Sequence, residues 1–363
     1  MKNTGKLLAV ILVLIPQILF SIDFVKIEKH VDETPSASTK TTTKLSKYLT
    51  GVFEDDDEKF AAIYFWVSKN IRYDVRQRNK ARMYFSANEL VNEVLRSKKG
   101  VCQHYAELFN ELSLKAGLKS FVIIGYGKES GKVMKLSHAW NAIKIDNNWY
   151  FIDATWGSGH ILDGKYKKSF KLKYFMVEPK EFILDHIPFD PMWQLLKQPI
   201  KFDEFDLGKI GEKSTKDFMY NDSIVKYSKL SEIERKTNKI RRIDSNGRKN
   251  KLVIAELKQE RNYIKISQKN EQIKNLNSGN FHYNAAVKQL NEYYKLKQKK
   301  GKSISKFKLL MELDSIEKKL TLARKLYAKI NTTDREILNK LRQATGLVKK
   351  FEKIMKEQRA MLR

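Results

Sequence analysis

The sequence KGVCQHYAELF spans residues 99–109 and contains Cys102, the chain's single cysteine. Gly100 interrupts regular structure just before a run in which apolar residues such as Phe109 and Leu112 recur at helical spacing. We therefore predict that a helix begins at Cys102. Backbone N–H groups at the start of a helix have no partner within it, so they favour a negatively charged sulfur and can bind an oxyanion.

Two later segments could supply the partners that this cysteine needs for catalysis. Residues 137–145 and 149–156 alternate as β-strands do, and the three polar residues between them are typical of a tight hairpin turn. The first segment contains His138 and the second contains Asp153. With a two-residue turn, the numbers of paired residues sum to 293 or 295, and either register places both side chains on the same face of the sheet.

These three residue types together predict a catalytic triad. Cys102 would be the nucleophile, His138 the base, and Asp153 the group that orients the imidazole and stabilises its cation. The alternatives are a small buried cysteine, a hydrogen-bonded histidine and a carboxylate at a strand end. Candidates for the oxyanion hole or the wall of the cleft are Gln103, Trp140, His104 and Trp156. The histidines lack metal-ligand spacing, so we predict neither a metal nor a cofactor.

Residues 1–21 have the pattern of a signal peptide. Lys2 and Lys6 precede an almost wholly apolar run at 7–20. An uncleaved anchor helix is the alternative, but the run is short for a membrane span and Pro16 interrupts it. We therefore expect an exported protein, periplasmic or extracellular in a bacterium. With one cysteine, the chain forms no internal disulfide.

The next two regions differ in composition. Residues 22–54 are rich in Ser, Thr and Lys, which is typical of a flexible linker. Residues 55–205 contain all five tryptophans, and four of the six prolines lie near the end of this region. Acidic residues at 55–57 favour a helix start, and apolar residues follow at helical spacing. We predict that residues 55–205 fold as one domain.

Residues 206–363 differ from the rest in charge and periodicity. Residues 211–363 carry 39 Lys and Arg against 17 Asp and Glu, a net charge of +22 out of +29 for the chain. Apolar residues recur every three or four positions at 316–330 and 337–355. We predict a basic, all-helical domain, a bundle of several long helices. It could bind an anionic envelope surface or a protein partner, or be no more than a solvated lysine-rich surface.

Several stretches together resemble the transglutaminase-like superfamily of papain-like cysteine enzymes. Their combination is specific, although no single stretch is, and the likeness covers about residues 55–200. Within the superfamily, it is to the bacterial and kyphoscoliosis-peptidase-type branch. The stretches are the helix and N-I-x-Y-D motif at 63–74, G-V-C-Q with Y-A at 100–106, S-H-A-W-N at 137–141, D-A-T-W-G at 153–157, and the closing segment at 174–195.

The resemblance implies an α+β fold in which the nucleophile helix packs on an antiparallel sheet. It gives Cys102, His138 and Asp153 the triad roles already predicted, and it departs from many relatives at His104, where they have glycine. It implies a thioester mechanism, most simply a hydrolase (a cysteine protease or amidase) with a protein or peptide substrate. Acyl transfer to amines and a non-catalytic envelope scaffold are the alternatives. Nucleic acid is not an expected partner of an exported chain.

Overall fold

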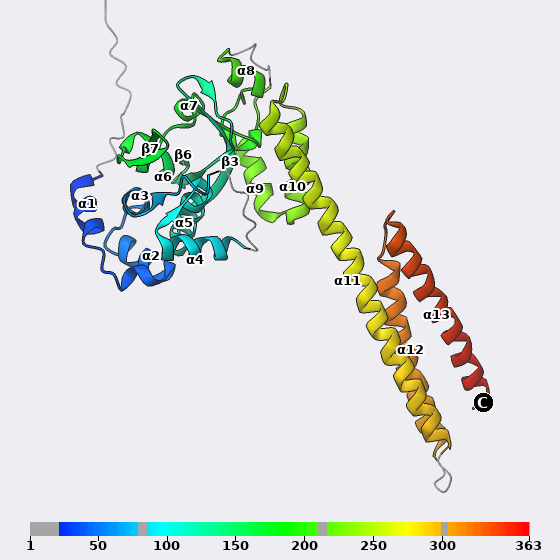
Figure 1. The fold of residues 1–363 in the computed structure, drawn as a ribbon. Helices are drawn as coiled ribbons and strands as arrows, with labels where there is room; N and C mark the ends of the chain where they lie inside the picture. Colours follow the sequence, from blue (N-terminus) through cyan, green and yellow to red (C-terminus); the bar gives the residue numbers. More distant parts are fainter. Residues whose placement is uncertain (1–21, 79–85, 210–215, 299–303, 363) are drawn as a thin grey trace, which may run out of the picture. The chain divides into compact units, whose positions relative to one another are not determined.

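The structure, a computed structural model, describes residues 22–78, 86–209, 216–298 and 304–362 (Figure 1). The predicted signal peptide, residues 1–21, lies outside these ranges. Contacts divide the chain into two compact units. The first unit comprises Met1–Leu230 and Arg241–Glu256, and the second comprises Ser231–Ile240 and Leu257–Arg363.

The first unit mixes helices and strands. Its α-helices are α1 (Phe24–Asp32), α2 (Thr42–Thr50), α3 (Asp56–Asn70), α4 (Ala87–Ser97), α5 (Cys102–Lys115), α6 (Ala154–Ser158), α7 (Pro179–Phe182), α8 (Phe202–Leu207) and α9 (Tyr220–Lys229). Its strands are β1 (Arg72–Tyr73), β2 (Lys99–Gly100), β3 (Lys119–Glu129), β4 (Lys132–Val133), β5 (His138–Ile145), β6 (Asn148–Ile152), β7 (Gly159–Leu162), β8 (Lys165–Lys168) and β9 (His186–Pro188). Short 3-10 helices are η1 (Ser38–Lys40), η2 (Leu172–Tyr174) and η3 (Pro191–Gln194).

An antiparallel sheet with the strand order β4-β3-β5-β6 forms the centre of the first unit, and β9 pairs with β3. Helix α5 contacts β3 and β5. The predicted α+β class, with the nucleophile helix on an antiparallel sheet, is therefore confirmed (Figure 1).

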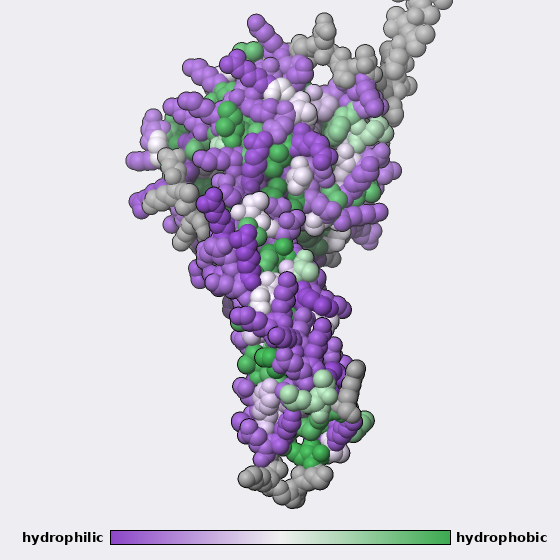
Figure 2. Space-filling view, turned by 90° about the vertical axis from the view of Figure 1, so that its right-hand side faces the viewer, coloured by the Kyte–Doolittle hydropathy of each residue, from purple (hydrophilic) through white to green (hydrophobic). Residues whose placement is uncertain are grey.

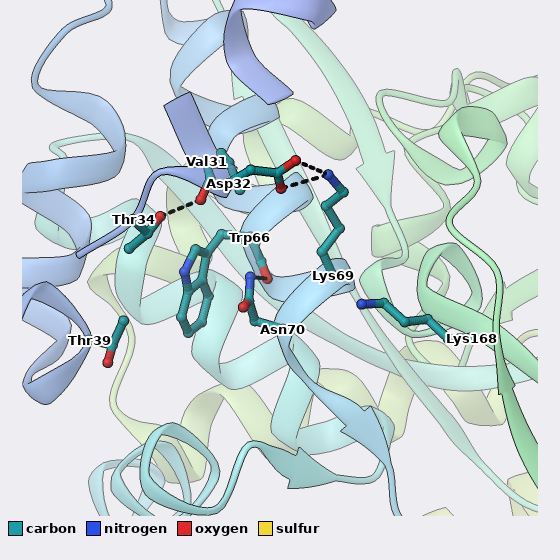
Figure 3. Close-up of a pocket in the computed structure, with 8 residues that line it drawn as sticks. All are labelled: Val31, Asp32, Thr34, Thr39, Trp66, Lys69, Asn70 and Lys168. Carbon is teal, nitrogen blue, oxygen red and sulfur yellow. Dashed lines mark hydrogen bonds and ion pairs between the residues drawn. The ribbon is translucent and has the colours of Figure 1, made fainter. Parts of the chain in front are cut away.

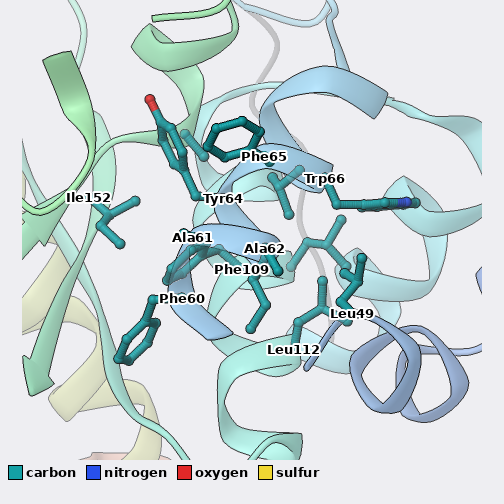
Figure 4. Close-up of a cluster of buried hydrophobic side chains, with 14 of the residues drawn as sticks. Leu49, Phe60, Ala61, Ala62, Tyr64, Phe65, Trp66, Phe109, Leu112 and Ile152 are labelled. Atoms are coloured by element: carbon teal, nitrogen blue, oxygen red, sulfur yellow. The ribbon is translucent and has the colours of Figure 1, made fainter. Parts of the chain in front are cut away.

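Helix α3 is buried on all sides. Every residue from Phe60 to Ser68 is buried, and helices α1, α2, α5 and α6 contact α3. The buried apolar side chains of α3 belong to a large hydrophobic cluster, part of which Figure 4 shows. Leu49 of α2 and Phe109 of α5 lie around the α3 side chains in this cluster. A helix that is apolar all round needs cover on every side, and in this chain the cover comes from elements before and after it.

The region predicted as a flexible linker, residues 22–54, contributes to that cover. Ile27 of α1 and Leu45 of α2 have no exposed surface and belong to the same cluster as α3. The hydroxyl side chains that suggested a linker include a helix cap: Thr41 Oγ1 accepts a hydrogen bond from the backbone N–H of Lys44 at 3.2 Å. The linker prediction was wrong because composition does not separate capping residues from flexible ones.

The first unit also extends beyond the predicted boundary at 205. Ile224 of α9 packs in the cluster that contains Trp149. The guanidinium of Arg242 donates two hydrogen bonds, of 2.6 and 2.7 Å, to the carboxylate of Asp190, which is buried. These contacts join residues on both sides of position 205 into one folded body.

Replacing Arg242 with alanine is expected to destabilise the first unit by about 3 kcal/mol, because the Asp190 carboxylate would stay buried without its cation. The measurement is the urea midpoint followed by tryptophan fluorescence, since all five tryptophans lie in this unit. Arg241→Ala, a change at the exposed neighbour, is the matched control. Equal midpoints for the two variants would show that the ion pair between Arg242 and Asp190 does not stabilise this unit.

The second unit is built from long helices. Helices α10 (Glu232–Asp244) and α11 (Lys251–Gln298) each contribute residues to both units, and they are followed by α12 (Lys306–Ala328) and α13 (Arg335–Ala360). Leu290 of α11, Leu313 of α12 and Phe351 of α13 share one buried cluster. The predicted helical C-terminal region is confirmed. Within the described residues, no helix combines the length and apolar composition needed to cross a bilayer. The face in Figure 2 is mostly hydrophilic, with small hydrophobic groups.

Candidate active site

Helix α5 begins at Cys102, as the sequence predicted, and Val101 is its N-cap residue. Nδ1 of His104 accepts a hydrogen bond from the backbone N–H of Val101 at 3.2 Å. A Cβ atom at Gly100 would lie 2.4 Å from the Cβ of His104, so only glycine fits there. His104 was a candidate for the cleft wall, but its side chain is buried. It holds the turn that presents Cys102.

The hairpin of β5 and β6 has one of the two predicted registers. Asn141 pairs with Ile152 and Ile145 pairs with Asn148, so the sum is 293. The predicted second strand, residues 149–156, ends earlier than expected, at Ile152. Asp153 is instead the N-cap of the short helix α6, a position that aspartate favours strongly.

Helix α6 and strand β5 bring the imidazole and the carboxylate together. Nε2 of His138 lies 2.6 Å from Oδ2 of Asp153. The other oxygen, Oδ1, accepts hydrogen bonds from the backbone N–H groups of Thr155 at 2.8 Å and Trp156 at 3.0 Å. The Asp153 side chain has no exposed surface. Its orientation is therefore fixed by backbone donors on one side and by His138 on the other.

The charges of this pair explain the titration of both groups. Burial disfavours the imidazolium, but the charge of Asp153, hydrogen bonds to Asp153 and Cys102, and the charge of Cys102 together raise the pKa of His138 to about 10. Burial also disfavours the carboxylate, yet the charge and hydrogen bond of His138, followed by those of His186, hold the pKa of Asp153 far below its usual range. The pair is therefore ionic at neutral pH.

The structure thus brings all three predicted triad residues together. Because Nε2 of His138 faces Asp153, the other ring nitrogen, Nδ1, is the one available to the half-buried sulfur of Cys102. Asn141 of β5 donates a hydrogen bond from Nδ2 to the carbonyl oxygen of Ala106 in α5 at 3.0 Å. This bond ties the histidine strand to the cysteine helix.

The family model described as the transglutaminase-like superfamily matches residues 43–154, a range that includes Cys102, His138 and Asp153. This chain contains a transglutaminase-like domain. Kyphoscoliosis peptidase of Homo sapiens is 33% identical to it over 160 residues, which are 42% of this chain and 24% of that protein. Hillarin of Drosophila melanogaster is 28% identical over 207 residues, 51% of this chain and 24% of that protein.

The chain therefore spans about a quarter of the length of these curated relatives. A crystal structure described as that of a TGase has 19% sequence identity and a TM-score of 0.25, and the match covers 44% of this chain and 40% of that chain. At that TM-score, the likeness adds nothing to the family assignment. The predicted resemblance to the superfamily is confirmed by the family match and by the kyphoscoliosis-peptidase relatives.

The remaining candidates occupy different environments in the transglutaminase-like domain. Trp156 is half-buried, and its ring stacks on that of His138 with centroids 5.4 Å apart, which shields one face of the imidazole from water. Trp140 is buried, and its Nε1 has no hydrogen-bond partner among the described residues. Gln103 is exposed. Trp156 therefore joins the site, and which group completes the oxyanion hole stays a prediction.

Two residues near the triad were not among the sequence candidates. Tyr73 of β1 lies opposite Gly100 of β2, and burial followed by the charge of Cys102 raises the pKa of its phenol. His186 of β9 is fully buried, with Nε2 3.2 Å from Oδ2 of Asp153. Both residues belong to stretches that carry the family resemblance, but neither has a sequence spacing that links it to the triad.

His138, Asp153 and His186 each place one potential metal-ligand atom within 4.8 Å of the others. These nitrogen and oxygen atoms are of the types that bind zinc. The 2.6 Å separation of Nε2 of His138 and Oδ2 of Asp153 is a hydrogen-bond distance, whereas two ligands of a tetrahedral zinc ion lie about 3.3 Å apart. Each of the two histidines is hydrogen-bonded to Asp153, so the three side chains do not have the arrangement of ligands around an ion.

A cavity of about 340 Å³ lies elsewhere in the first unit, beside α1 and α3 (Figure 3). Lys69 lines this cavity, and its Nζ forms ion pairs with Asp32 at 2.8 Å and with Glu28, which is not a lining residue, at 2.7 Å. No predicted site residue lines this cavity, so we assign it no part in the chemistry. Its lining residues are Val31, Asp32, Thr34, Thr39, Trp66, Lys69, Asn70 and Lys168.

Proposed function

We propose that this chain is a cysteine-dependent enzyme that cleaves peptide amides through a thioester. The observation that carries the proposal is the position of His138, which is hydrogen-bonded to Asp153 and interacts with Cys102. In this assignment Cys102 is the nucleophile, His138 is the base and then the acid, and Asp153 orients the imidazole. The transglutaminase-like fold includes enzymes that use this chemistry.

The first half of the reaction forms the thioester. The sulfur of Cys102 attacks the carbonyl carbon of the amide, and the oxyanion is bound by backbone N–H groups at the start of α5. The C–N bond then breaks, and His138 gives its proton to the departing amine. The ion pair with Asp153 keeps that proton on the imidazole until the leaving group takes it.

The second half decides between hydrolysis and transfer. Water attacks the thioester with His138 as base and releases an acid, whereas an amine in place of water would give a new amide. We propose water as the acceptor, because the human relative is described as a peptidase and the sequence contains no calcium-loop pattern of the animal crosslinking type.

We expect iodoacetamide to alkylate Cys102 faster in the folded protein than in the unfolded protein at neutral pH. The backbone N–H groups at the start of α5 and the neighbouring imidazolium both stabilise negative charge on the attacking sulfur. Since the chain has one cysteine, the mass increase on labelling reports this site alone. The measurement is the second-order rate constant between pH 4 and 10.

The control is the same protein unfolded in urea, in which neither the helix start nor the imidazolium is held beside the sulfur, so its cysteine should react more slowly. If the folded protein follows the same curve as the unfolded one, the catalytic assignment is wrong. That outcome would favour the alternative function, a binding or scaffold protein with an inactive site.

Two expectations from the sequence remain predictions. Export rests on residues 1–21, which lie outside the described residues. An anionic surface or a protein partner for the helical region rests on charge, because residues 231–240 and 257–363 carry 30 Lys and Arg against 12 Asp and Glu. Such an excess attracts anionic partners over long range at low salt.

A further inference from the structure

The triad carboxylate binds two histidines through one oxygen. Oδ2 of Asp153 lies 2.6 Å from Nε2 of His138 and 3.2 Å from Nε2 of His186. The second ring nitrogen of His186, Nδ1, lies 2.5 Å from Oδ1 of Asp185. His186 therefore links the buried carboxylate of the triad to a second carboxylate that is 30% exposed.

Packing fixes the orientation of the His186 ring. The ring has no exposed surface and stacks on Phe182, with centroids 4.1 Å apart and planes 19° from parallel. The ring centroid of Trp156 lies 4.3 Å from that of His186, and the Trp140 ring meets the His186 ring edge-on with centroids 5.2 Å apart. A polar ring that is fully buried in this way has no water to bond, so its nitrogens must form hydrogen bonds with neighbouring groups of the protein.

Hydrogen-bond accounting gives the protonation of Nε2. An ionised carboxylate only accepts hydrogen bonds, and a ring nitrogen without hydrogen only accepts them as well. Since Asp153 is ionised, a bare Nε2 on His186 would face an acceptor with no proton between them. Nε2 therefore carries a hydrogen and donates it to Asp153.

We propose that His186 is a positioning residue of the catalytic triad, which donates its Nε2–H to the same Asp153 oxygen that orients His138. This inference rests on the proposed function of the triad. With the two backbone donors on Oδ1, the carboxylate then has four hydrogen-bond donors and a single orientation. The extra donor also reduces the proton affinity of Asp153. The carboxylate therefore stabilises the protonated form of His138 less than it would without His186.

Three titratable groups outside the triad also interact with it. The phenols of Tyr64, Tyr73 and Tyr174 interact with Asp153 from α3, β1 and η2. Burial, followed by neighbouring negative charges, raises the pKa of all three phenols, that of Tyr174 to about 12. The phenols therefore stay neutral over the range in which the triad works, and they do not provide the proposed effect.

Removing the His186 donor is expected to raise the pKa of both Asp153 and His138. The rate at which iodoacetate alkylates Cys102 should fall at alkaline pH where His138 loses its proton, because the imidazolium attracts this anionic reagent; in measurements up to pH about 11, that fall should move to higher pH by about 0.5–1 unit. His186→Phe tests this, because phenylalanine keeps the ring that stacks on Phe182 and loses the Nε2 donor. His282→Phe, the same change on α11 in the second unit, is the matched control and should leave the alkaline fall in place.

A second pair of variants covers the possibility that His186→Phe does not fold. The amide nitrogen of glutamine can reach the position of Nε2, whereas that of asparagine reaches only the position of Nδ1. We expect His186→Gln to keep the wild-type pH of the alkaline fall and His186→Asn to shift it upward. Identical profiles for these two folded variants would overturn the proposal, as would a folded His186→Phe variant with an unshifted alkaline fall.

The same assay separates this proposal from the proposed function. Wild-type protein that reacts no faster than unfolded protein at neutral pH refutes the triad itself. Wild-type protein that reacts rapidly, together with His186 variants that retain its pH profile, leaves the triad intact and reduces His186 to a packing residue. Melting temperatures measured alongside show whether a variant has lost stability as well.

Discussion

Cys102→Ala should lose all measurable peptide cleavage, a decrease in kcat of roughly 10⁶-fold. Alanine cannot form a thioester, and a loss of the nucleophile is not repaired by the remaining residues of a triad. The measurement is cleavage of a peptide library followed by mass spectrometry, with wild-type protein in parallel. The library also reports which peptide bonds the enzyme accepts.

The fold of this variant should be nearly unchanged, because Cys102 is only half-buried and the substitution removes a single sulfur. An unaltered urea midpoint, followed by tryptophan fluorescence, is the control. Cleavage by Cys102→Ala at the wild-type rate would refute the assignment. If wild-type protein instead attaches a labelled primary amine to peptides without cleaving them, the triad stands and the acceptor is an amine.

Asp153→Asn should decrease activity by about 10⁴-fold, the loss that the corresponding change causes in a serine-protease triad. The side chain accepts on Oδ1 from two backbone N–H groups and on Oδ2 from His138 and His186. An amide has one acceptor oxygen and one NH₂ group, so one of these two pairs of donors must face another donor. Breaking a buried ion pair also destabilises the fold by about 3–5 kcal/mol.

Asp163→Asn is the matched control for this variant. It makes the same chemical change at an exposed turn residue with φ of 51°, a conformation that asparagine tolerates. Activity and urea midpoint should both stay at the wild-type values. A folded Asp153→Asn protein with wild-type activity would show that the carboxylate does not orient His138.

The stability difference between wild type and Asp153→Asn should depend on pH. The pKa of His138 in the folded protein, about 10, exceeds its ordinary value of about 6.5. The stabilisation from its ion pair is therefore fully present below pH about 6.5 and is lost as the pH rises through about 10. The pKa of Asp153 is lowered, so its stabilisation is present above about pH 3.9 and is lost as the pH falls through the lowered value.

Both conditions hold between pH about 4 and 6.5, where the difference in unfolding free energy should be largest. It should shrink toward pH 10. The two pKa shifts describe one ion pair, so their effects are not added. A difference that does not change between pH 5 and 10 would show that the two groups are not coupled in the folded protein.

Local rules were sufficient where the interacting residues are close in sequence. A two-residue turn limits the hairpin to two registers, one of which pairs Asn141 with Ile152 as observed. The alternation of residues overestimated the length of the second strand, because Asp153 caps a helix. A capping aspartate and a strand-end aspartate have similar sequence surroundings, and the contacts of its side chain decide between them.

Composition was a poor guide where burial depends on distant partners. Residues 22–54 are polar on average, yet Ile27 and Leu45 are needed to cover α3. Likewise, the change in charge after about residue 210 does not coincide with the end of the first unit, because Arg242 is held by Asp190. Average polarity does not show which few side chains meet a partner far away in the chain.

The sequence alone determined the family, the helix that begins at Cys102 and the hairpin that leads from His138 to Asp153, because each depends on residues within a short stretch or on a motif. Only the tertiary structure brought in His186, which lies 33 residues after Asp153 in sequence and 3.2 Å from it in space. The pairing of β9 with β3 brings His186 close to Asp153. No periodicity in the sequence encodes such long-range pairing.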